Sequence, residues 1–320
     1  MKVLITGGAG FIGSHLSDAF IGRGDEVFVI DMAETGKVRH LLGEPRFHFI
    51  HDSVLNAPIV DALVDKVDLV YHLAAVVGVE HYVADPYSVL NVNINGTQNV
   101  LRAAYRSGKK VVFSSTSEIY GRNPKVPFDE HDERVLGSTR IDRWCYSTSK
   151  AAGEHFCFAY HRMGLPVVIT RYFNVYGPRL DRTDMGRVIT IFIGQILRKQ
   201  PISLVNGGAQ TRCFTYVDDA VRATVAAGLK PEAVGEILNI GTDEETSIRT
   251  LAETLVKITG HEAGIVDVAQ EKVYGKYYED VARRVPSVRR MEDIIGVKMT
   301  TPLEEGIKLT VDWFFAQPRS

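Results

Sequence analysis

Glycines close to the start of the chain set strong limits on its fold. Residues 3–6 form a short apolar run, and a helical pattern begins near residue 11. Between them stand Gly7, Gly8, Gly10 and Gly13. Glycine at this spacing lets the backbone turn tightly, approach a pyrophosphate and pack a helix against a strand. The start of the helix would also offer free N–H groups to phosphates. We therefore predict a dinucleotide-binding turn, with cofactor contacts from Gly7, Gly10, Phe11, Ile12 and Gly13.

Asp31 strengthens this prediction because it follows a second apolar run, residues 26–30. An acidic side chain at the end of that strand can bind the ribose diol of a dinucleotide. The same carboxylate would repel a 2′-phosphate. The sequence therefore favours NAD over NADP as the cofactor.

The first half of the chain alternates apolar runs with helix-length segments. The further runs are residues 47–50, 68–71, 110–114 and 167–171, and the helical stretches between them include 86–107 and 147–163. Continuous apolar strands joined by helices are typical of a parallel sheet that is covered on both faces. We predict an α/β fold with a Rossmann-type doubly wound parallel sheet over residues 1–174. A smaller C-terminal α/β substrate domain would follow over residues 175–320, with some exchange of strands and helices between the two.

The composition argues against several classes of protein. Of the 320 residues, 45% are hydrophobic and 24% are charged, which is ordinary for a soluble globular protein. A net charge of -2 gives no basic footprint for nucleic acid. The chain has no uninterrupted apolar run of about 18 residues, the length a membrane span needs. The histidines show no metal-ligand spacing. We expect a cytoplasmic protein with no metal, no nucleic-acid partner and no membrane segment.

Tyr146 and Lys150 stand four residues apart in a predicted helix and therefore share one face. A phenol is a useful base near neutral pH only where its anion is stabilised, and a nearby ammonium can do that. Thr116 follows the strand that begins at Lys110. That position would place its hydroxyl beside the nicotinamide, within reach of a reacting alcohol.

With these residues in place, the chain resembles the extended short-chain dehydrogenase/reductase family, in its nucleotide-sugar branch. The shared motifs are residues 6–13, Asp31, His72-Leu73-Ala74-Ala75, Asn93, Thr116, Tyr146 with Lys150, Tyr172-Phe173-Asn174 and Gly177-Pro178-Arg179. The resemblance implies that Thr116, Tyr146 and Lys150 form a catalytic triad. It also implies cofactor contacts from Asp52, Ser53, Leu73, Ala74, Ala75, Asn93, Tyr146, Lys150 and Tyr172.

The residues after Thr116 distinguish the reactions of this branch. All members are expected to begin alike: Tyr146 takes a proton from a sugar hydroxyl while the C4 hydride moves to NAD. The family's 4,6-dehydratases then use an Asp-Glu pair, where this chain has Ser117 and Glu118. The run 115–121 is most similar to UDP-glucuronate decarboxylases, including UDP-xylose synthases and the decarboxylase of the aminoarabinose pathway. Those enzymes pair the glutamate with an arginine that matches Arg284.

We therefore expect decarboxylation of UDP-glucuronate after C4 oxidation, giving UDP-xylose or a UDP-4-keto-pentose. The catalytic residues would be Thr116, Ser117, Glu118, Tyr146, Lys150 and Arg284. Oxidation at C4 turns a uronate into a β-keto acid, which loses carbon dioxide because the electrons flow into the new carbonyl. Two alternatives stay open. One is a 4-epimerase of a UDP-hexose or UDP-uronate that uses the same tyrosine, lysine and NAD; the other is a non-catalytic NAD-binding regulator.

A second set of side chains is expected to hold the UDP-sugar. These residues are Asn174, Arg187, Arg212, Tyr278 and Arg284. Planar guanidinium groups suit a diphosphate. The predicted helices 86–107 and 147–163 carry more apolar residues than one core face needs. Because the equivalent helices of the family pair across a two-fold axis, we expect a homodimer formed through a four-helix bundle.

Overall fold

The computed structural model describes residues 1–180, 183, 186–269 and 281–317. Its centre is a seven-stranded sheet with the order β11–β6–β5–β4–β1–β2–β3, and every neighbouring pair is parallel. The strands are β1 (Lys2–Thr6), β2 (Glu26–Asp31), β3 (Phe47–His51), β4 (Leu69–His72), β5 (Lys110–Thr116), β6 (Val167–Tyr172) and β11 (Ile237–Ile240). Strand order reverses between β1 and β4, so a crevice is expected where those two strands end. The predicted Rossmann-type doubly wound sheet is confirmed.

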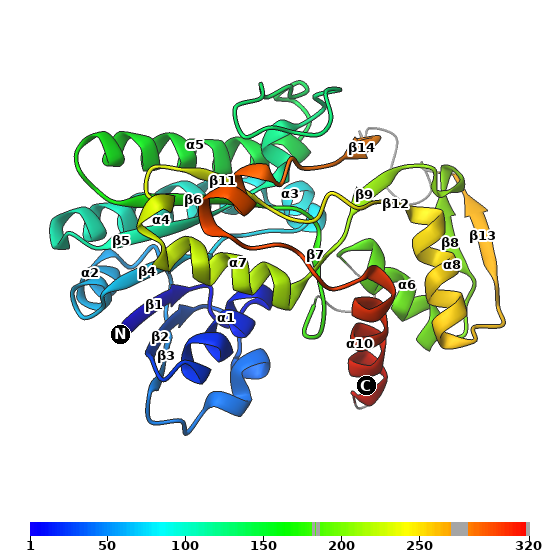
Figure 1. Ribbon diagram of the computed structural model, residues 1–320, viewed down its shortest axis with the longest axis horizontal. Helices are drawn as coiled ribbons and strands as arrows, with labels where there is room; N and C mark the ends of the chain where they lie inside the picture. The colour runs from blue at the N-terminus through cyan, green and yellow to red at the C-terminus, as the bar shows by residue number, and fades with distance from the viewer. Residues whose placement is uncertain (181–182, 184–185, 270–280, 318–320) are drawn as a thin grey trace.

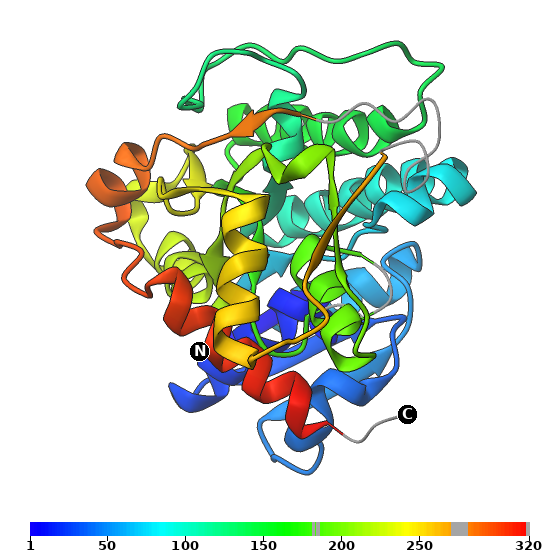
Figure 2. The same ribbon diagram turned by 90° about the vertical axis from the view of Figure 1, so that its right-hand side faces the viewer.

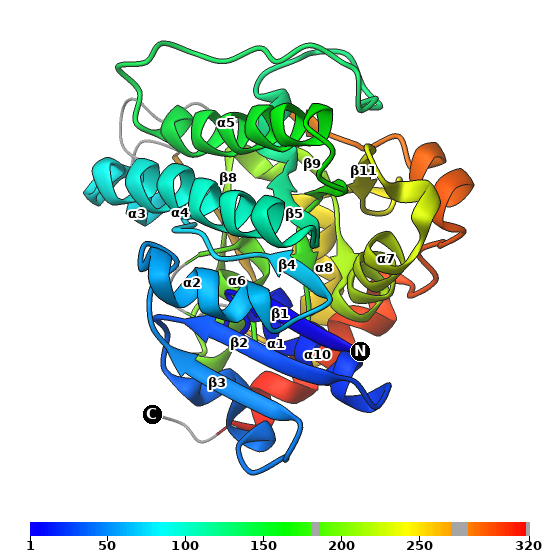
Figure 3. The same cartoon turned by 90° about the vertical axis from the view of Figure 1, so that its left-hand side faces the viewer.

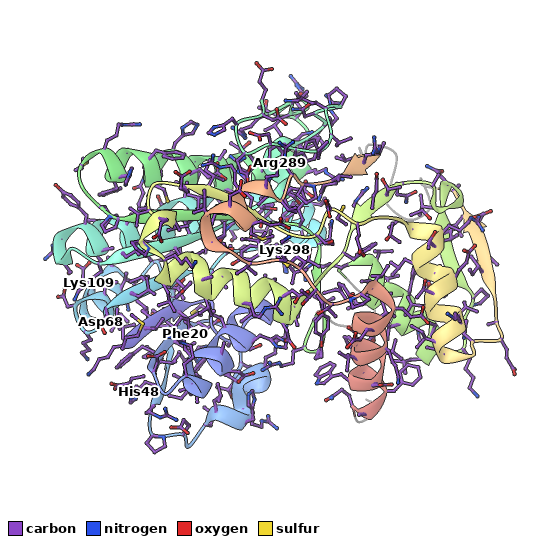
Figure 4. All side chains as sticks on the ribbon, in the orientation of Figure 1. Phe20, His48, Asp68, Lys109, Arg289 and Lys298 are labelled. Atoms are coloured by element: carbon purple, nitrogen blue, oxygen red, sulfur yellow. The ribbon has the colours of Figure 1, made fainter. Side chains whose placement is uncertain are left out.

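Helices cover both faces of this sheet (Figures 1 and 3). One face carries α1 (Phe11–Gly22) and α7 (Val217–Leu229), and the other carries α2 (Ala57–Asp65), α4 (Pro86–Ser107) and α5 (Arg143–Arg162). Each face has its own apolar core. Phe20 of α1, labelled in Figure 4, is fully buried, and its ring centroid lies 5.3 Å from that of Tyr71 in β4. The helices therefore fix the sheet from both sides and leave its carboxyl edge for a site.

The ends of α4 follow directly from its sequence. The side chain of Asp85 accepts a hydrogen bond from the Ser88 backbone N–H at 3.0 Å, which caps the first turn. Pro86 stands at the first helical position, where no N–H partner is needed. Gly108 ends the helix with a left-handed φ of 62°. The short helix α3 (Val79–Ala84) comes immediately before this cap.

Residues after β6 build most of a second layer beyond the carboxyl ends of the strands (Figure 1, right). Its helices are α6 (Val188–Leu197), α8 (Ile248–Thr259) and α10 (Leu303–Ala316). Its strands are β7 (Val175–Tyr176), β8 (Ile202–Val205), β9 (Thr211–Cys213), β10 (Thr215–Tyr216), β12 (Glu245–Ser247), β13 (Ile265–Val268) and β14 (Arg283–Arg284). They form three small sheets, β10–β7, β12–β9–β14 and β13–β8. Figure 2 shows α8 and β13 on the outer side of this layer.

Five short 3-10 or π segments complete the described chain. They are η1 (Thr35–Leu41), η2 (Ser117–Tyr120), η3 (Asn206–Gly208), η4 (Pro231–Ala233) and η5 (Met291–Ile295). The segment η2 matters most for function, because it leads directly out of β5 at the carboxyl edge of the sheet.

Some element boundaries differ from those predicted. Helix α5 begins at Arg143, about one turn before the predicted stretch 147–163, so Tyr146 lies inside the helix with Lys150. Strand β11 and helix α7 lie beyond residue 174 and belong to the central sheet and its cover, as an exchange of elements between the two parts would require. The chain thus returns to the first layer after entering the second. Within the described ranges, no helix has both the length and the apolar content needed to cross a membrane.

Candidate active site

The glycine turn is packed too tightly for other residues. Gly7 has a left-handed φ of +73°, and a Cβ atom added to it would lie 2.7 Å from the Ala74 backbone nitrogen. A Cβ atom on Gly13 would collide with the Gly7 carbonyl oxygen. The turn therefore presses against the chain that leaves β4, at the point where strand order reverses. Gly10 precedes α1 and has no side chain. The backbone N–H groups at the start of α1 therefore have no side-chain cap at this position.

The acidic residues after β2 and β3 lie at the same edge. Asp31 accepts hydrogen bonds from the backbone N–H of Ala9, in the turn, and of Ala33, each at 2.9 Å. Asp52 accepts one from the Ser53 backbone N–H at 2.6 Å. The Asp31 carboxylate is thus held against the glycine turn, which is where a ribose next to a bound pyrophosphate would need it.

The segment after β4 is fixed by buried polar side chains. His72 contacts the Thr6 hydroxyl at 2.7 Å and the Thr97 hydroxyl at 3.0 Å. Burial, and to a smaller extent the charge of Lys150, lower the pKa of His72 to about 3, so the imidazole is neutral. Asn93 accepts from the Val76 N–H at 2.8 Å and donates to the Ser149 hydroxyl at 3.0 Å. Leu73, Ala74 and Ala75 are therefore held between the turn and α5.

Thr116, Tyr146 and Lys150 come together where β5 meets α5. The Tyr146 phenol is hydrogen-bonded to Thr116, and its ring stacks on that of Tyr82. Burial raises the pKa of Tyr146 to about 12, and the charge of Glu118 raises it too, against the Thr116 hydrogen bond and Arg187.

The buried Lys150 Nζ donates to the Ser114 carbonyl at 2.7 Å. Burial lowers the pKa of Lys150 to about 8, while Cys157 and Glu154 raise it. The Tyr146 phenol, with its pKa of about 12, needs added positive charge nearby before it can act as a base near neutral pH.

Glu118 of η2 lies among arginines. Its Oε1 is 2.8 Å from Arg284 Nη1, and its Oε2 is 3.6 Å from Arg143 Nη2. Arg284 pairs in register with Arg212 across β14 and β9, so a third guanidinium belongs to the same cluster. Burial pushes the pKa of Glu118 up, but Arg284, Arg143 and Arg212 outweigh it and hold the pKa below its ordinary value. Ser117, beside Glu118, is buried.

Other predicted residues lie at varying distances from this cluster. The Arg187 guanidinium lies 5.8 Å from the centre of the Phe11 ring, and its charge reaches Tyr146. Asn174 donates to the Cys213 carbonyl at 3.0 Å, one residue after Arg212. The Tyr172 hydroxyl contacts Thr224 of α7 at 2.8 Å, so this side chain turns toward the helix cover. Tyr278 lies outside the described residues. No group of three or more His, Cys, Asp or Glu residues within the described ranges could hold a metal ion.

The chain is similar in sequence and in fold to proteins that are already known. Residues 3–241 match the model of the NAD dependent epimerase/dehydratase family. The chain belongs to this family. The expected resemblance and the expected cofactor, NAD, are thereby confirmed.

Members of the family that resemble this chain include decarboxylases and epimerases. UDP-N-acetyl-alpha-D-glucosaminuronate decarboxylase of Bacillus cytotoxicus is 40% identical over 98% of this chain and 97% of its own. UDP-glucuronic acid decarboxylase 1 of Xenopus tropicalis is 35% identical over 98% of this chain and 72% of its own. A solved UDP-glucuronic acid 4-epimerase from Bacillus cereus, in complex with UDP-glucuronic acid and NAD, superposes with a TM-score of 0.88. It is 33% identical and covers 98% of this chain and 99% of its own.

The residues of this NAD dependent epimerase/dehydratase family chain fit the dinucleotide. Gly7 and Gly13 give the turn the tight backbone packing that a dinucleotide-binding turn needs, and the Asp31 carboxylate is fixed against it. NAD, when bound, supplies a hydride acceptor and a positive charge near the tyrosine.

Two residues of the site were not identified from the sequence. Arg143 stands three residues before Tyr146, so helical spacing places both on one side of α5 and could have identified it. Tyr82 belongs to the six-residue helix α3, and it carries no comparable signal because the helix is too short to show a period.

Proposed function

We propose that this chain is an NAD-dependent decarboxylase of a UDP-linked uronate. The observation that carries the proposal is the pairing of Glu118 with Arg284 beside Tyr146, where the charges of Arg143 and Arg212 also reach Glu118. A neutral hexose presents no charged group at C5, whereas a uronate brings a carboxylate, which is a group that guanidinium side chains bind well.

The chemistry divides between the two groups of residues. Tyr146 takes the proton of the C4 hydroxyl, with Thr116 holding the hydroxyl and Lys150 supplying positive charge nearby. The hydride at C4 must also leave, and bound NAD would accept it, so that C4 becomes a carbonyl. The bond between C5 and the carboxylate then breaks, and its electrons pass into that carbonyl to give an enolate. Tyr146 and Thr116 stabilise that enolate by hydrogen bonds. Glu118, with Arg284 and Ser117, handles the carboxylate and the proton that replaces carbon dioxide at C5.

Binding is proposed to follow the two layers of the fold. Residues 1–174 would hold NAD through Gly7, Gly10, Phe11, Ile12, Gly13, Asp31, Asp52, Ser53, Leu73, Ala74, Ala75, Asn93, Tyr146, Lys150 and Tyr172. Residues 175–320 would hold the UDP-sugar through Asn174 at the boundary, and Arg187, Arg212, Tyr278 and Arg284. Strand β11 and helix α7 return to the first layer, so the two parts would act as one body.

The uronate that binds can carry either an N-acetyl group or a hydroxyl group at C2 of the sugar. One relative is named for UDP-N-acetyl-alpha-D-glucosaminuronate and another for UDP-glucuronic acid. Both uronates present the same carboxylate to Glu118 and Arg284, so both should be offered to the protein. The one with the higher kcat/KM identifies the substrate.

A 4-epimerase of a UDP-uronate is the second candidate. The likeness to the UDP-glucuronic acid 4-epimerase favours it, because that protein has the same fold over nearly its whole length. Mass spectrometry after incubation with NAD and each uronate separates the two. Loss of one carbon dioxide supports the decarboxylase, and an isomer of unchanged mass supports the epimerase.

Glu118→Gln tests the assigned step. We expect it to slow carbon dioxide release much more than C4 oxidation, which is followed by the absorbance of reduced nicotinamide. Glu304→Gln is the matched control, since Glu304 is exposed on α10 and pairs only with Lys257 in the described part of the chain. Equal turnover of the Glu118→Gln variant and this control would refute the role of Glu118.

We also propose a cytoplasmic homodimer formed through α4 and α5. These helices run side by side on the outer surface of the sheet (Figure 3). The α4 residue Tyr105 is 40% exposed, and its ring centroid lies 5.6 Å from that of Tyr160 in α5. Light scattering at micromolar protein should give twice the mass of the chain, and a monomer would refute the bundle.

A further inference from the structure

A buried hydroxyl joins parts of the chain that are distant in sequence. The Tyr120 side chain is fully buried, and its hydroxyl donates to Asn239 Oδ1 at 2.8 Å. The same oxygen accepts from Arg171 Nη1 at 2.9 Å. Arg171 is in turn held by both carboxylate oxygens of Glu154, at 2.9 and 2.7 Å. Tyr120 is thus fixed to β6, α5 and β11 at once.

Asn239 also holds the segment that follows β14 by hydrogen bonds. Its Nδ2 donates to the Phe128 carbonyl at 3.0 Å and to the Ser287 carbonyl at 3.2 Å. Phe128 also exchanges backbone hydrogen bonds with Val285 and Ser287, each at 2.8 Å. Arg284 immediately precedes Val285, so the backbone that carries its guanidinium is tied to Asn239.

Tyr120 is also two residues from Glu118 in the short segment η2. The Tyr120 hydroxyl, through its hydrogen bond to Asn239, therefore links the segment that carries Glu118 to the segment that carries Arg284. The ion pair itself, at 2.8 Å, joins side chains from two segments that share no other direct link among these contacts. Its geometry depends on how β5, β11 and the segment after β14 are held relative to one another.

We propose that Tyr120 is a positioning residue, whose hydroxyl sets the placement of Glu118 against Arg284 through Asn239. It acts on the carboxylate-handling step more than on C4 oxidation, because its link to α5 is indirect, through Arg171 and Glu154. Tyr146 and Lys150 contact Thr116 and Ser114 of β5 directly. The inference rests on the proposed function for its kinetic consequence, but the placement of the pair can be measured without any substrate.

Tyr120→Phe is the sharpest variant. It removes only the hydroxyl and keeps the ring, which stacks on Phe128 with centroids 4.5 Å apart and lies 4.9 Å from the Arg171 guanidinium. Tyr71→Phe is the matched control. The Tyr71 hydroxyl is equally buried, but it donates to the Val225 carbonyl at 3.3 Å in α7, away from the cluster.

In single-turnover experiments with the NAD-loaded protein, we expect Tyr120→Phe to slow carbon dioxide release by about tenfold to a hundredfold. The formation of reduced nicotinamide should change by less than about twofold. Tyr71→Phe should leave both steps close to wild type. Equal loss of both steps in Tyr120→Phe, or behaviour matching Tyr71→Phe, would overturn the proposal.

A second measurement separates this proposal from the proposed function. Carbon-13 NMR of labelled glutamate, assigned with Glu118→Gln, follows the titration of Glu118 in the substrate-free protein. We expect the Glu118 pKa to rise in Tyr120→Phe and to stay unchanged in Tyr71→Phe. If wild type releases no carbon dioxide but this shift is seen, the proposed function fails and the positioning role stands. If the shift is absent, the positioning role fails.

Folding of the variants is checked by circular dichroism and by bound NAD. Should Tyr120→Phe fail to fold, Asn239→Leu removes the other side of the same hydrogen bond and is tested in the same way. If neither variant folds, the hydroxyl serves the fold as a whole and the proposal is overturned.

Discussion

The ring of Tyr82 stacks on the ring of Tyr146, with centroids 4.9 Å apart and planes within 10° of parallel. Tyr82 comes from α3, which follows the segment that Asn93 ties to α5. The contact covers one face of the proposed base and excludes water from it. The high pKa of Tyr146 is therefore set partly by a residue outside the strand and helix that carry the triad.

Loss of the Tyr82 ring should lower the pKa of Tyr146. Burial is the largest cause of its rise to about 12, so a Tyr82→Ala variant that admits water should bring the pKa down by about one unit. Tyr82→Phe keeps the ring and should leave the value unchanged. Tyrosinate absorbance, taken as the difference from matching proteins that carry Tyr146→Phe, follows this titration. An unchanged pKa in Tyr82→Ala would show that the stack does not shield the phenol.

Two glycines of α1 should respond in opposite ways to alanine. In Gly13→Ala the new methyl group meets the Gly7 carbonyl and the Gly8 Cα atom, and both are backbone. We expect lower thermal stability and loss of bound NAD. Gly22→Ala is the control, since no atom lies within 4 Å of the added Cβ, and alanine favours a helix by about 1 kcal/mol. Retention of NAD in Gly13→Ala at the wild-type level would contradict the tight turn.

Acid should destabilise the protein through His72. Its pKa is 6.5 in the unfolded chain and about 3 when folded, so below pH 6.5 the unfolded chain binds a proton that the folded chain does not. The contribution of neutral His72 to the free energy of unfolding is therefore fully present above pH 6.5 and is lost as the pH falls toward 3. The loss reaches about 2 kcal/mol near pH 5. Urea unfolding of wild type and His72→Asn between these values measures it. Equal pH slopes in the two proteins would contradict the prediction.

The two arginines nearest Glu118 should contribute unequally to its pKa. Arg284 Nη1 lies 2.8 Å from the carboxylate and Arg143 Nη2 lies 3.6 Å from it. Because both charges lower the Glu118 pKa, Arg284→Met should raise it by about one to three units and Arg143→Met by less. The acidic limb of the pH-rate profile should move toward higher pH in both variants, and further in Arg284→Met than in Arg143→Met. A larger effect from Arg143→Met would reverse this assignment.

Local sequence patterns were enough to predict the central sheet. Apolar runs and helix-length spacers gave six strands within one or two residues of their ends, and the Gly turn and Asp31 gave the carboxyl edge. These signals are local, because a buried parallel strand needs a continuous apolar run and a tight turn needs glycine. Helix α4 was predicted at its observed bounds, since Pro86 and Gly108 mark both ends.

Patterns of this kind could not predict the second layer to the same extent. Strand β14 has two residues and pairs with β9, which has three, so neither is long enough to show a period. The approach of Arg284 to Glu118 depends on that pairing and on the contacts of Asn239, and it was expected only through a family resemblance. For Arg143 a local signal exists, because it stands three residues before Tyr146. That signal is weak, because charged residues are common at the start of a helix.

Strand β14 comes late in the chain, after all seven strands of the central sheet. During translation, the parts proposed to hold the dinucleotide therefore leave the ribosome before the arginine that neutralises Glu118. A polypeptide released too early, short of β14, would still contain Tyr146 and Lys150 but would lack a complete charge cluster. Cofactor contacts alone would therefore not complete the site, because the guanidinium that pairs with Glu118 comes from the last strand of the chain.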